Sequence, residues 1–321
     1  RRPPARPVCR TMATSTARAL LASLALAASA SGFVHNRPMV ALRGAGWAPV
    51  ARRAGQGVAR TRGSGCTALA PVGAGLVAST ASAQVALGVN SVLAGLAWAK
   101  GQRALTPAGL LHAWILGVLL WSTLGPEGWA LCALYLVGGT AVTKVGKAKK
   151  EALGIAEGRG GSRGPENVWG SAATASLCAI GAVLAPAHRM TFQVGFVASL
   201  ATKLSDTFAS EIGKAYGKTT FLITTFKQVP PGTEGAVSLE GTLAGVAGSL
   251  LIAGAALWPL RLCGPLGVAL SAAAAFVATN CESLIGATLQ GRYPFMTNEV
   301  VNFVNTLIGA LVAMGLRLAC V

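Results

Sequence analysis

The chain has 321 residues, of which 53% are hydrophobic and only 12% are charged, against about a quarter in a typical soluble domain. Its formal net charge is +17, but residues 1–69 contain eleven arginines and no Asp, Glu or Lys. The charge excess therefore belongs mostly to this segment, and its arginines are not interleaved with aromatic residues, which excludes nucleic acid as an expected partner. This composition is not that of a soluble enzyme and predicts an all-α, polytopic membrane protein.

The N-terminal segment has the composition of an organelle address. From Met12, the expected start of translation, to about Ala70 the chain is rich in Ala, Ser, Arg and Thr and has no acidic residue, which is typical of a transit peptide. The apolar run 17–30 would alternatively be a secretory signal, which precedes the transit peptide in algae with complex plastids. We expect residues 1–70 to be a mitochondrial or chloroplast transit peptide with an upstream disordered segment, and residues 71–321 to form an integral membrane domain.

Apolar runs long enough to cross about 30 Å of hydrocarbon recur along the rest of the chain. They predict seven to eight transmembrane helices, at 75–99, 107–124, 128–144, 169–187, 190–209, 240–260, 264–288 and 298–318. Within the sixth of these, Gly241, Gly245 and Gly248 have the spacing that favours close packing between helices in lipid.

The cysteines and histidines predict neither a disulfide framework nor a metal centre. The seven cysteines are odd in number, are scattered, and form no Cys-x-x-Cys pair. The three histidines lie far apart in the sequence, and we expect His112 and His188 to be interfacial or hydrogen-bonded residues rather than catalysts.

Positive charge is distributed unevenly between the loops. With strict alternation, the loops after the first, third, fifth and seventh spans carry twelve Lys and Arg residues, and the opposite loops carry three. The positive-inside rule then places the polar loops 145–167 and 213–237 on the cytoplasm-equivalent face, which is the stroma in a plastid. Four helix ends bring five of the ten acidic residues to that same face, which predicts a site there: Asp206, Glu211, Glu240, Glu282 and Glu299.

Asp206 is the only aspartate in the chain, and a carboxylate at membrane depth is retained mainly where it has a partner or a task. Asp206 and Glu211 form i, i+3 pairs with Lys203 and Lys214, respectively. Hydroxyl side chains surround Asp206, and oxygen ligands of this kind suit Mg²⁺. We expect Asp206, Glu211 and Glu240 to hold this metal, with Lys203 and Lys214 as catalytic cations. The alternative is two structural ion pairs at a helix end.

The segment 213–220 resembles a P-loop, but it is one residue too short between its glycines and follows an apolar helix rather than a strand, which excludes a Walker A site. A glycine–lysine loop can still bind phosphate through its backbone N–H groups and its lysine charges. We therefore expect Lys214, Lys218 and Lys227 to bind a nucleotide.

A stripe of asparagines marks the last predicted helix. Asn298, Asn302 and Asn305 stand at i, i+4 and i+7, with Glu299 beside them. Together with Glu282, we expect Asn298, Glu299 and Asn302 to complete the catalytic pocket. The alternative is that these amides form hydrogen bonds that join helices.

Four segments, 196–214, 219–227, 229–245 and 297–309, closely resemble a known integral-membrane family. This family includes the animal transmembrane protein nineteen and the plastid phytyl-phosphate kinase of tocopherol synthesis. The loop 167–170 (Asn-Val-Trp-Gly) also resembles a motif of the family, and the resemblance covers about residues 80–318. It implies phosphoryl transfer from a nucleoside triphosphate, CTP foremost, to phytyl phosphate, giving phytyl diphosphate. The isoprenoid tail would lie between helices, in the bilayer. The plastid member of the family further implies a chloroplast envelope or thylakoid as the location.

Two other functions compete with this one. A transporter or flippase for a polyprenyl phosphate would use the same carboxylates as coupling sites, but its site should lie near the middle of the bilayer. A related membrane kinase or cytidylyltransferase would act on another isoprenoid. The gathering of acids at one face favours an enzyme over a transporter.

Overall fold

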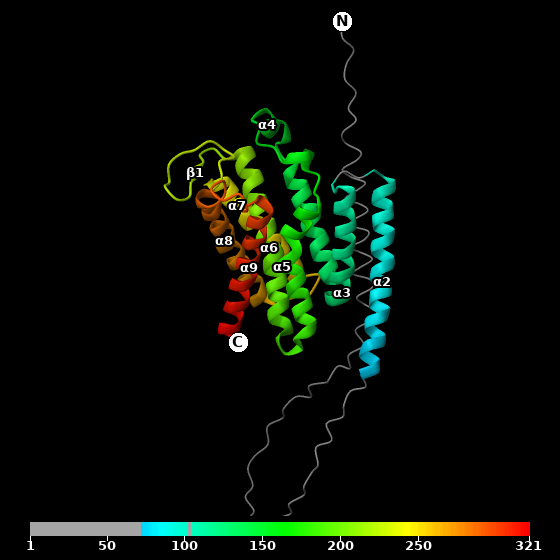
Figure 1. Cartoon of the computed structure of the whole chain (residues 1–321). Helices are drawn as coiled ribbons and strands as arrows, with labels where there is room; N and C mark the ends of the chain where they lie inside the picture. Colours follow the sequence, from blue (N-terminus) through cyan, green and yellow to red (C-terminus); the bar gives the residue numbers. More distant parts are fainter. Residues whose placement is uncertain (1–71, 102–103) are drawn as a thin grey trace, which may run out of the picture.

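The computed structural model describes residues 72–101 and 104–321, so the expected transit peptide at 1–70 lies outside the described residues. The described chain is almost entirely helical (Figure 1). Its elements are α2 (Val72–Ala99), α3 (Pro107–Thr143), α4 (Lys147–Ala152), η1 (Gly158–Gly161), α5 (Pro165–Leu184), η2 (Pro186–His188), α6 (Arg189–Tyr216), β1 (Phe221–Leu222), β2 (Ala236–Val237), α7 (Leu239–Leu257), α8 (Pro265–Thr288) and α9 (Asn298–Cys320).

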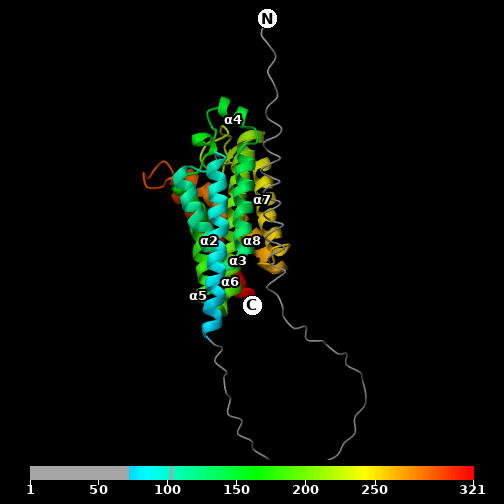
Figure 2. The ribbon, with the colours of Figure 1, turned by 90° about the vertical axis from the view of Figure 1, so that its right-hand side faces the viewer.

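The long helices stand side by side as a bundle, with their axes roughly parallel (Figure 2). Within the described residues, six helices are long and apolar enough to cross a membrane: α2, α3, α5, α7, α8 and α9. The 28-residue helix α6 is also long enough, but Gln193, Lys203 and Asp206 lower the hydropathy of its apolar part. The prediction of an all-α transmembrane bundle is confirmed.

Helix α3 contains the second and third predicted spans, which meet at a break. Gly125 has φ 76° and ψ −173°, far from helical values, and Pro126 follows it. In a straight helix, Trp114 and Trp129 would lie about 22 Å apart. Their indole N–H groups nevertheless donate hydrogen bonds to two adjacent residues of α2, Ser91 and Asn90, respectively. The two halves of α3 therefore run in opposite directions, and eight segments alternate across the bundle as the sequence predicts.

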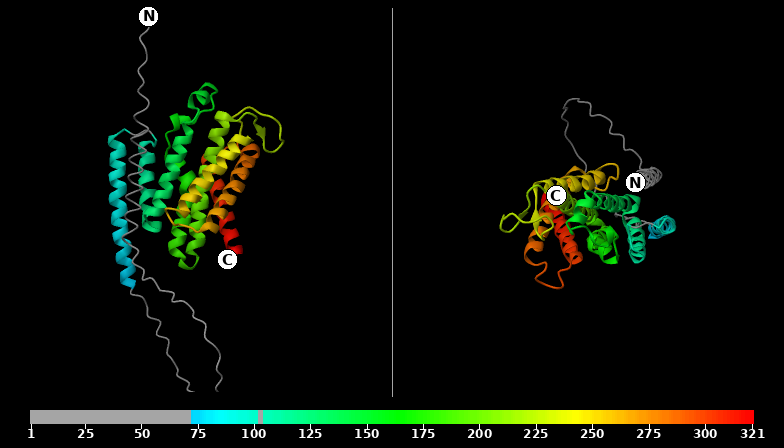
Figure 3. Two further views of the ribbon diagram at one scale, coloured as in Figure 1. Left: turned by 180° about the vertical axis from the view of Figure 1, so that it is seen from behind. Right: turned by 90° about the horizontal axis from the view of Figure 1, so that it is seen from above.

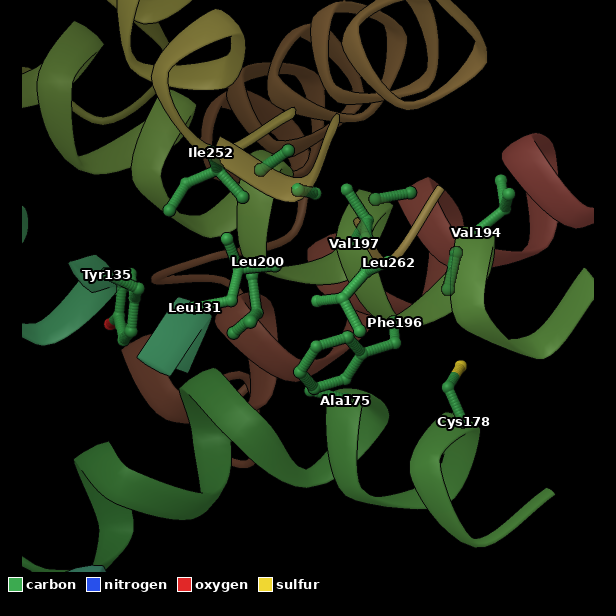
Figure 4. Packing of buried hydrophobic residues seen from close by; sticks show 14 of the residues in the cluster. Leu131, Tyr135, Ala175, Cys178, Val194, Phe196, Val197, Leu200, Ile252 and Leu262 are labelled. Atoms are coloured by element: carbon green, nitrogen blue, oxygen red, sulfur yellow. The ribbon is translucent and has the colours of Figure 1, made fainter. Parts of the chain in front are cut away.

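Helix α6 forms the centre of the bundle and packs against α3, α5, α7, α8 and α9. Every residue from Val194 to Thr207 is buried. Side chains of α6 such as Phe196 and Leu200 meet Leu131, Ala175 and Ile252 in the apolar core (Figure 4). The one helix with a charged centre is thus the one shielded from lipid by its neighbours.

Helix α7 lies close to α6 because its contact face is made of glycines. A Cβ atom at Gly245 would come within 3.1 Å of the backbone oxygen of Ser205, and one at Gly248 within 3.0 Å of that of Leu204. No side chain larger than hydrogen fits there without moving a backbone. The predicted close packing through small residues is confirmed.

The described part of the chain contains five of the seven cysteines, together with His112 and His188. Its five cysteines are free, and three of them lie in or against the bundle core: Cys132, Cys178 and Cys263. His112 accepts a hydrogen bond from Trp169 Nε1 at 2.9 Å.

The two long polar loops lie at the same end of the bundle, where Figure 1 shows α4 and β1, while the C-terminus lies at the other end. Gly232 of the second loop packs directly on Ile155 of the first, so the two loops are in contact. The prediction that loops 145–167 and 213–237 share one face is confirmed. Seen from above, α2 stands at the periphery, away from α9 (Figure 3).

Candidate active site

A cavity of about 220 Å³ opens at this loop-bearing end of the bundle. Helices α5, α6, α7, α8 and α9 form its walls, and the loops before α5 and α7 contribute further lining residues. The sequence predicted seven of its lining residues as site residues: Lys203, Asp206, Glu211, Lys214, Glu282, Asn298 and Asn302. These residues are up to 99 positions apart, and the fold brings them to one cavity.

Lys203 ties two helices together at the floor of this cavity. Its Nζ donates to Asp206 Oδ2 at 2.6 Å and to Asn302 Oδ1 at 2.7 Å. The Lys203 and Asp206 side chains are only 9% and 10% exposed. The predicted i, i+3 ion pair between Lys203 and Asp206 is therefore present. Asn302, from the asparagine stripe on α9, is a second hydrogen-bond partner of Lys203.

A second carboxylate lies beside Asp206. Glu282 of α8 is within hydrogen-bonding reach of Asp206. Glu234 is close enough to Glu282 for the two carboxylates to repel each other. Lys203 is the cation that acts on this pair. Two carboxylates facing one lysine leave an excess of negative charge, which favours a shared proton or a bound cation between them.

Glu211 is held by cations from two directions. Lys150 of α4 forms a buried ion pair with Glu211 and also donates to the carbonyl oxygen of Thr143 at 2.8 Å. Lys214 lies 3.7 Å from Glu211, as the i, i+3 spacing predicted. The Lys150 side chain is 1% exposed, although it comes from a basic run that sequence alone would place in solvent.

The carboxylates expected as metal ligands do not meet. The described residues hold no group of three or more His, Cys, Asp or Glu side chains that could share a metal ion. Asp206 and Glu211 are five positions apart and so point about 140° apart around the axis of α6. Glu240 begins α7 outside the cavity, where its Oε2 faces the backbone N–H of Lys218 at 3.4 Å.

The pair of Asp206 and Glu282 is a better fit to Mg²⁺ than the expected set. Protein sites for Mg²⁺ in phosphoryl transfer commonly use one or two carboxylates and complete the coordination with water and substrate phosphates. Beside this pair, the Thr279 hydroxyl donates a hydrogen bond to the Ser205 hydroxyl at 3.1 Å, and both residues line the cavity. The donor set is therefore suited to a hard cation that arrives with a phosphate.

Arg163 is a cavity residue that the sequence did not single out. Its backbone is fixed by hydrogen bonds to Ala104 and Thr106, and its Nη1 donates to Tyr135 Oη at 2.7 Å. The neighbouring Tyr135 does most to raise the pKa of the guanidinium above its ordinary value, against the opposing effect of burial. Gly139 leaves the space that the side chain needs, since a Cβ there would lie 3.0 Å from Arg163 Nη2.

A glycine-bearing loop forms one side of the cavity. Gly232 and Gly235 have φ of +87° and +74°, a region that other residues rarely adopt. A Cβ at Gly235 would also lie 2.5 Å from the backbone oxygen of Ser283 on α8. The loop can therefore press against both Ile155 and α8, which brings Glu234 to the cavity.

Four predicted residues stand outside the cavity lining. Lys218 and Lys227 are exposed on the loop between α6 and α7, and Glu240 lies at the start of α7. Glu299 lies behind the cavity, where its Oε1 accepts from Asn167 Nδ2 at 3.2 Å. Asn167, from the loop motif, lines the cavity itself, so this hydrogen bond connects Glu299 to the cavity lining.

The chain is similar to known integral membrane proteins. Residues 89–310 match the model of the family described as integral membrane protein DUF92. An uncharacterized membrane protein of Synechocystis sp. is 54% identical over 71% of this chain and 89% of its own length. The chloroplastic protein VTE6 of Arabidopsis thaliana is 47% identical over 65% of this chain and 64% of its own length.

A more distant relative and the solved structures complete the comparison. An uncharacterized membrane protein of Methanocaldococcus jannaschii is 33% identical over 67% of this chain and 87% of its own length. No solved structure matches the chain. The family match covers more than half of the chain, including every helix that lines the cavity, and agrees with the resemblance noted in the sequence. The chain belongs to the DUF92 family of integral membrane proteins.

Proposed function

We propose that this protein is a phytyl-phosphate kinase, which transfers a phosphoryl group from a nucleoside triphosphate, CTP foremost, to phytyl phosphate. The observation that carries the proposal is the cavity itself. It combines a carboxylate pair, Asp206 and Glu282, with the cations Lys203, Lys214 and Arg163 at the end of a membrane bundle. The similarity to VTE6 and the family resemblance support phytyl phosphate as the acceptor.

Phosphoryl transfer requires mainly positioning and neutralisation of charge. An oxygen of phytyl phosphate attacks the γ-phosphorus of the nucleotide, the bond to the β–γ bridging oxygen breaks, and the nucleoside diphosphate leaves. The acceptor is already an anion, so no side chain has to remove a proton from it. Mg²⁺, held by Asp206 and Glu282, would neutralise charge on the transferring phosphoryl group.

The remaining cavity residues orient the two phosphate groups. The Arg163 guanidinium, a planar fork held by Tyr135, suits two-point binding of a phosphate. Lys214 is partly exposed at the cavity rim and adds a point charge. Lys203 holds Asp206 in place while Asn302 fixes the ammonium from the opposite helix.

The proposal is tested with purified protein in lipid vesicles, phytyl phosphate and radiolabelled CTP. Label in the γ-phosphate should appear in phytyl diphosphate, and omission of Mg²⁺ should stop the reaction. Competition by unlabelled ATP, GTP and UTP measures the nucleotide preference. Absence of any labelled lipid with all four nucleotides would refute the kinase assignment.

The same assay separates the competing functions. A cytidylyltransferase would transfer label from the α-phosphate of CTP to the lipid and release pyrophosphate. A flippase would move phytyl phosphate between leaflets without consuming nucleotide. The carboxylates that line the cavity lie toward the loop-bearing end of the bundle rather than at its centre, which favours the enzyme.

A chloroplast membrane is the location we propose. The acid-free, arginine- and serine-containing segment at residues 1–70 and the chloroplastic relative support it. Fusion of residues 1–70 to a fluorescent protein should direct it to plastids, and a cytosolic signal would contradict this location.

A further inference from the structure

The cavity has two sides of different chemistry. Arg163, Glu157 and Asn167 line the side next to the loops, together with Glu234. Farther from the loops, α7 and α8 contribute five uncharged residues to the lining: Thr242, Gly245, Phe276, Thr279 and Asn280. We call these five residues the α7–α8 opening.

The α7–α8 opening reaches the outer surface of the bundle at membrane depth. Phe276 of α8 lines the cavity and is also 47% exposed. It stands at the middle of this 24-residue helix, far from both loop ends. Phe276, Asn280 and Ser283 repeat at i, i+4 and i+7, so one face of α8 runs from the exposed surface to the charged part of the cavity.

The surface around this opening is the kind that faces hydrocarbon. Leu243 and Leu250 of α7 are 61% and 49% exposed, and Val277 of α8 is 45% exposed. Between Glu240 and Glu282, neither α7 nor α8 contains a charged residue. Arg261 is the one charged residue in this stretch, and it lies in the loop that connects the two helices. A polar cavity that opens sideways through such a surface can receive a ligand with a charged head and an apolar tail.

We infer that the α7–α8 opening admits the hydrocarbon chain of a single-chain lipid phosphate directly from the bilayer. The inference rests on the proposed function, because the phosphate of this lipid is the acceptor in the cavity. The chain lies against Phe276 and Thr242, and the phosphate remains beside Asp206, Glu282 and Lys203. The nucleotide then approaches from the opposite, loop-bearing side, so the two substrates do not compete for one path.

Blocking the opening should discriminate between lipid and soluble acceptors. Thr242→Trp places a bulky ring in the opening, whereas Leu243→Trp places the same ring on the adjacent lipid-facing position as a control. With phytyl phosphate, we expect kcat/KM to fall by about tenfold or more in Thr242→Trp, the size of a steric overpacking effect. With the five-carbon dimethylallyl phosphate, the loss in the same variant should be much smaller than with phytyl phosphate, and Leu243→Trp should match the unmodified protein with both acceptors. Equal losses with both acceptors, or no loss with either, would overturn the inference.

Photo-crosslinking of the unmodified protein gives a readout that needs neither catalysis nor a variant. An alkyl phosphate with a diazirine in the middle of its chain should label peptides containing 242–245 or 276–280, and excess phytyl phosphate should suppress the labelling. Competable labelling confined to other helices, or no competable labelling, would refute the opening. If unmodified protein phosphorylates neither acceptor, the proposed function fails, and the crosslinks still decide whether the opening binds a lipid phosphate.

Discussion

Lys203 is the buried cation around which the polar groups of the cavity are arranged. Its ammonium has a carboxylate partner on its own helix, an amide partner on α9 and the carboxylate of Glu282 on α8 nearby. An isolated charge would be costly at this depth, so the lysine and the acids stabilise one another. The arrangement fixes three helices around one point.

Replacing Asp206 separates a catalytic role from a structural one. We expect Asp206→Asn to reduce phosphoryl transfer by about a hundredfold or more, the effect of removing one preorganised charge from a site. Loss of stability should remain modest because Glu282 and Asn302 still face Lys203. Activity in vesicles and the melting temperature in detergent measure the two effects.

The double variant Asp206→Asn with Lys203→Met is the control for this prediction. If Asp206 served only to neutralise Lys203, removing the lysine as well would restore much of the activity. We expect the double variant to stay inactive. An active double variant would end the catalytic interpretation of Asp206.

Two asparagines on one face of α9 should respond differently to the same substitution. Asn302 accepts from Lys203, whereas neither amide atom of the fully buried Asn305 has a hydrogen-bond partner among the described residues. A buried polar group without a partner is unfavourable, so Asn305→Leu should keep or raise the melting temperature. Asn302→Leu should lower both stability and activity. A lower melting temperature for Asn305→Leu would show that Asn305 binds something essential, such as a buried water.

The residues that sequence reasoning missed share one cause. Lys150 and Arg163 lie in the segment 145–167, whose basic, glycine-rich composition is typical of a solvated loop. Their burial depends on contacts 61 and 28 residues away, with Glu211 and Tyr135. By contrast, Asp206 was predictable because an acid in an apolar run is informative without any knowledge of tertiary contacts.

At the scale of helices, α7 offers a matched pair of glycines. A Cβ at Gly248 would meet the backbone of α6 at 3.0 Å, whereas one at Gly254 would have no atom within 4 Å. Gly248→Ala should therefore lower the melting temperature in detergent. Gly254→Ala should leave it unchanged or raise it, since alanine favours a helix over glycine by about 1 kcal/mol. Equal effects of the two variants would contradict the close packing of α6 and α7.

Helix positions were largely predictable from hydropathy, because length and apolar content determine a span wherever its neighbours lie. Residues 107–124 and 128–144 illustrate this, since the break at Gly125 separates them as expected. The central position of α6 was not predictable. Its polar residues lower the hydropathy signal, and only the packing of five neighbouring helices shows that it is the innermost one.

For the whole molecule, the shared face of the polar loops has a direct test. In a cysteine-free background, Glu151→Cys and Lys227→Cys should react with an impermeant maleimide from the same side of sealed vesicles, since both positions are exposed at the α4 end. His188→Cys, exposed at the other end, should react only from the opposite side. Labelling of positions 151 and 227 from opposite sides would refute the eight-segment arrangement.

The reversal at Gly125 decides whether the described part of the chain crosses the bundle an even or an odd number of times. If α3 continued as one straight helix, the number of crossings would change from even to odd, and every later helix would be inverted relative to α2. A 37-residue helix would also be about 55 Å long, far more than a bilayer requires. Because φ at Gly125 is +76°, a side chain there would strain the turn on which this parity depends. The compartment that the loop-bearing end of the cavity faces is therefore set by a backbone bend at the far end of the bundle, at a position outside the cavity lining.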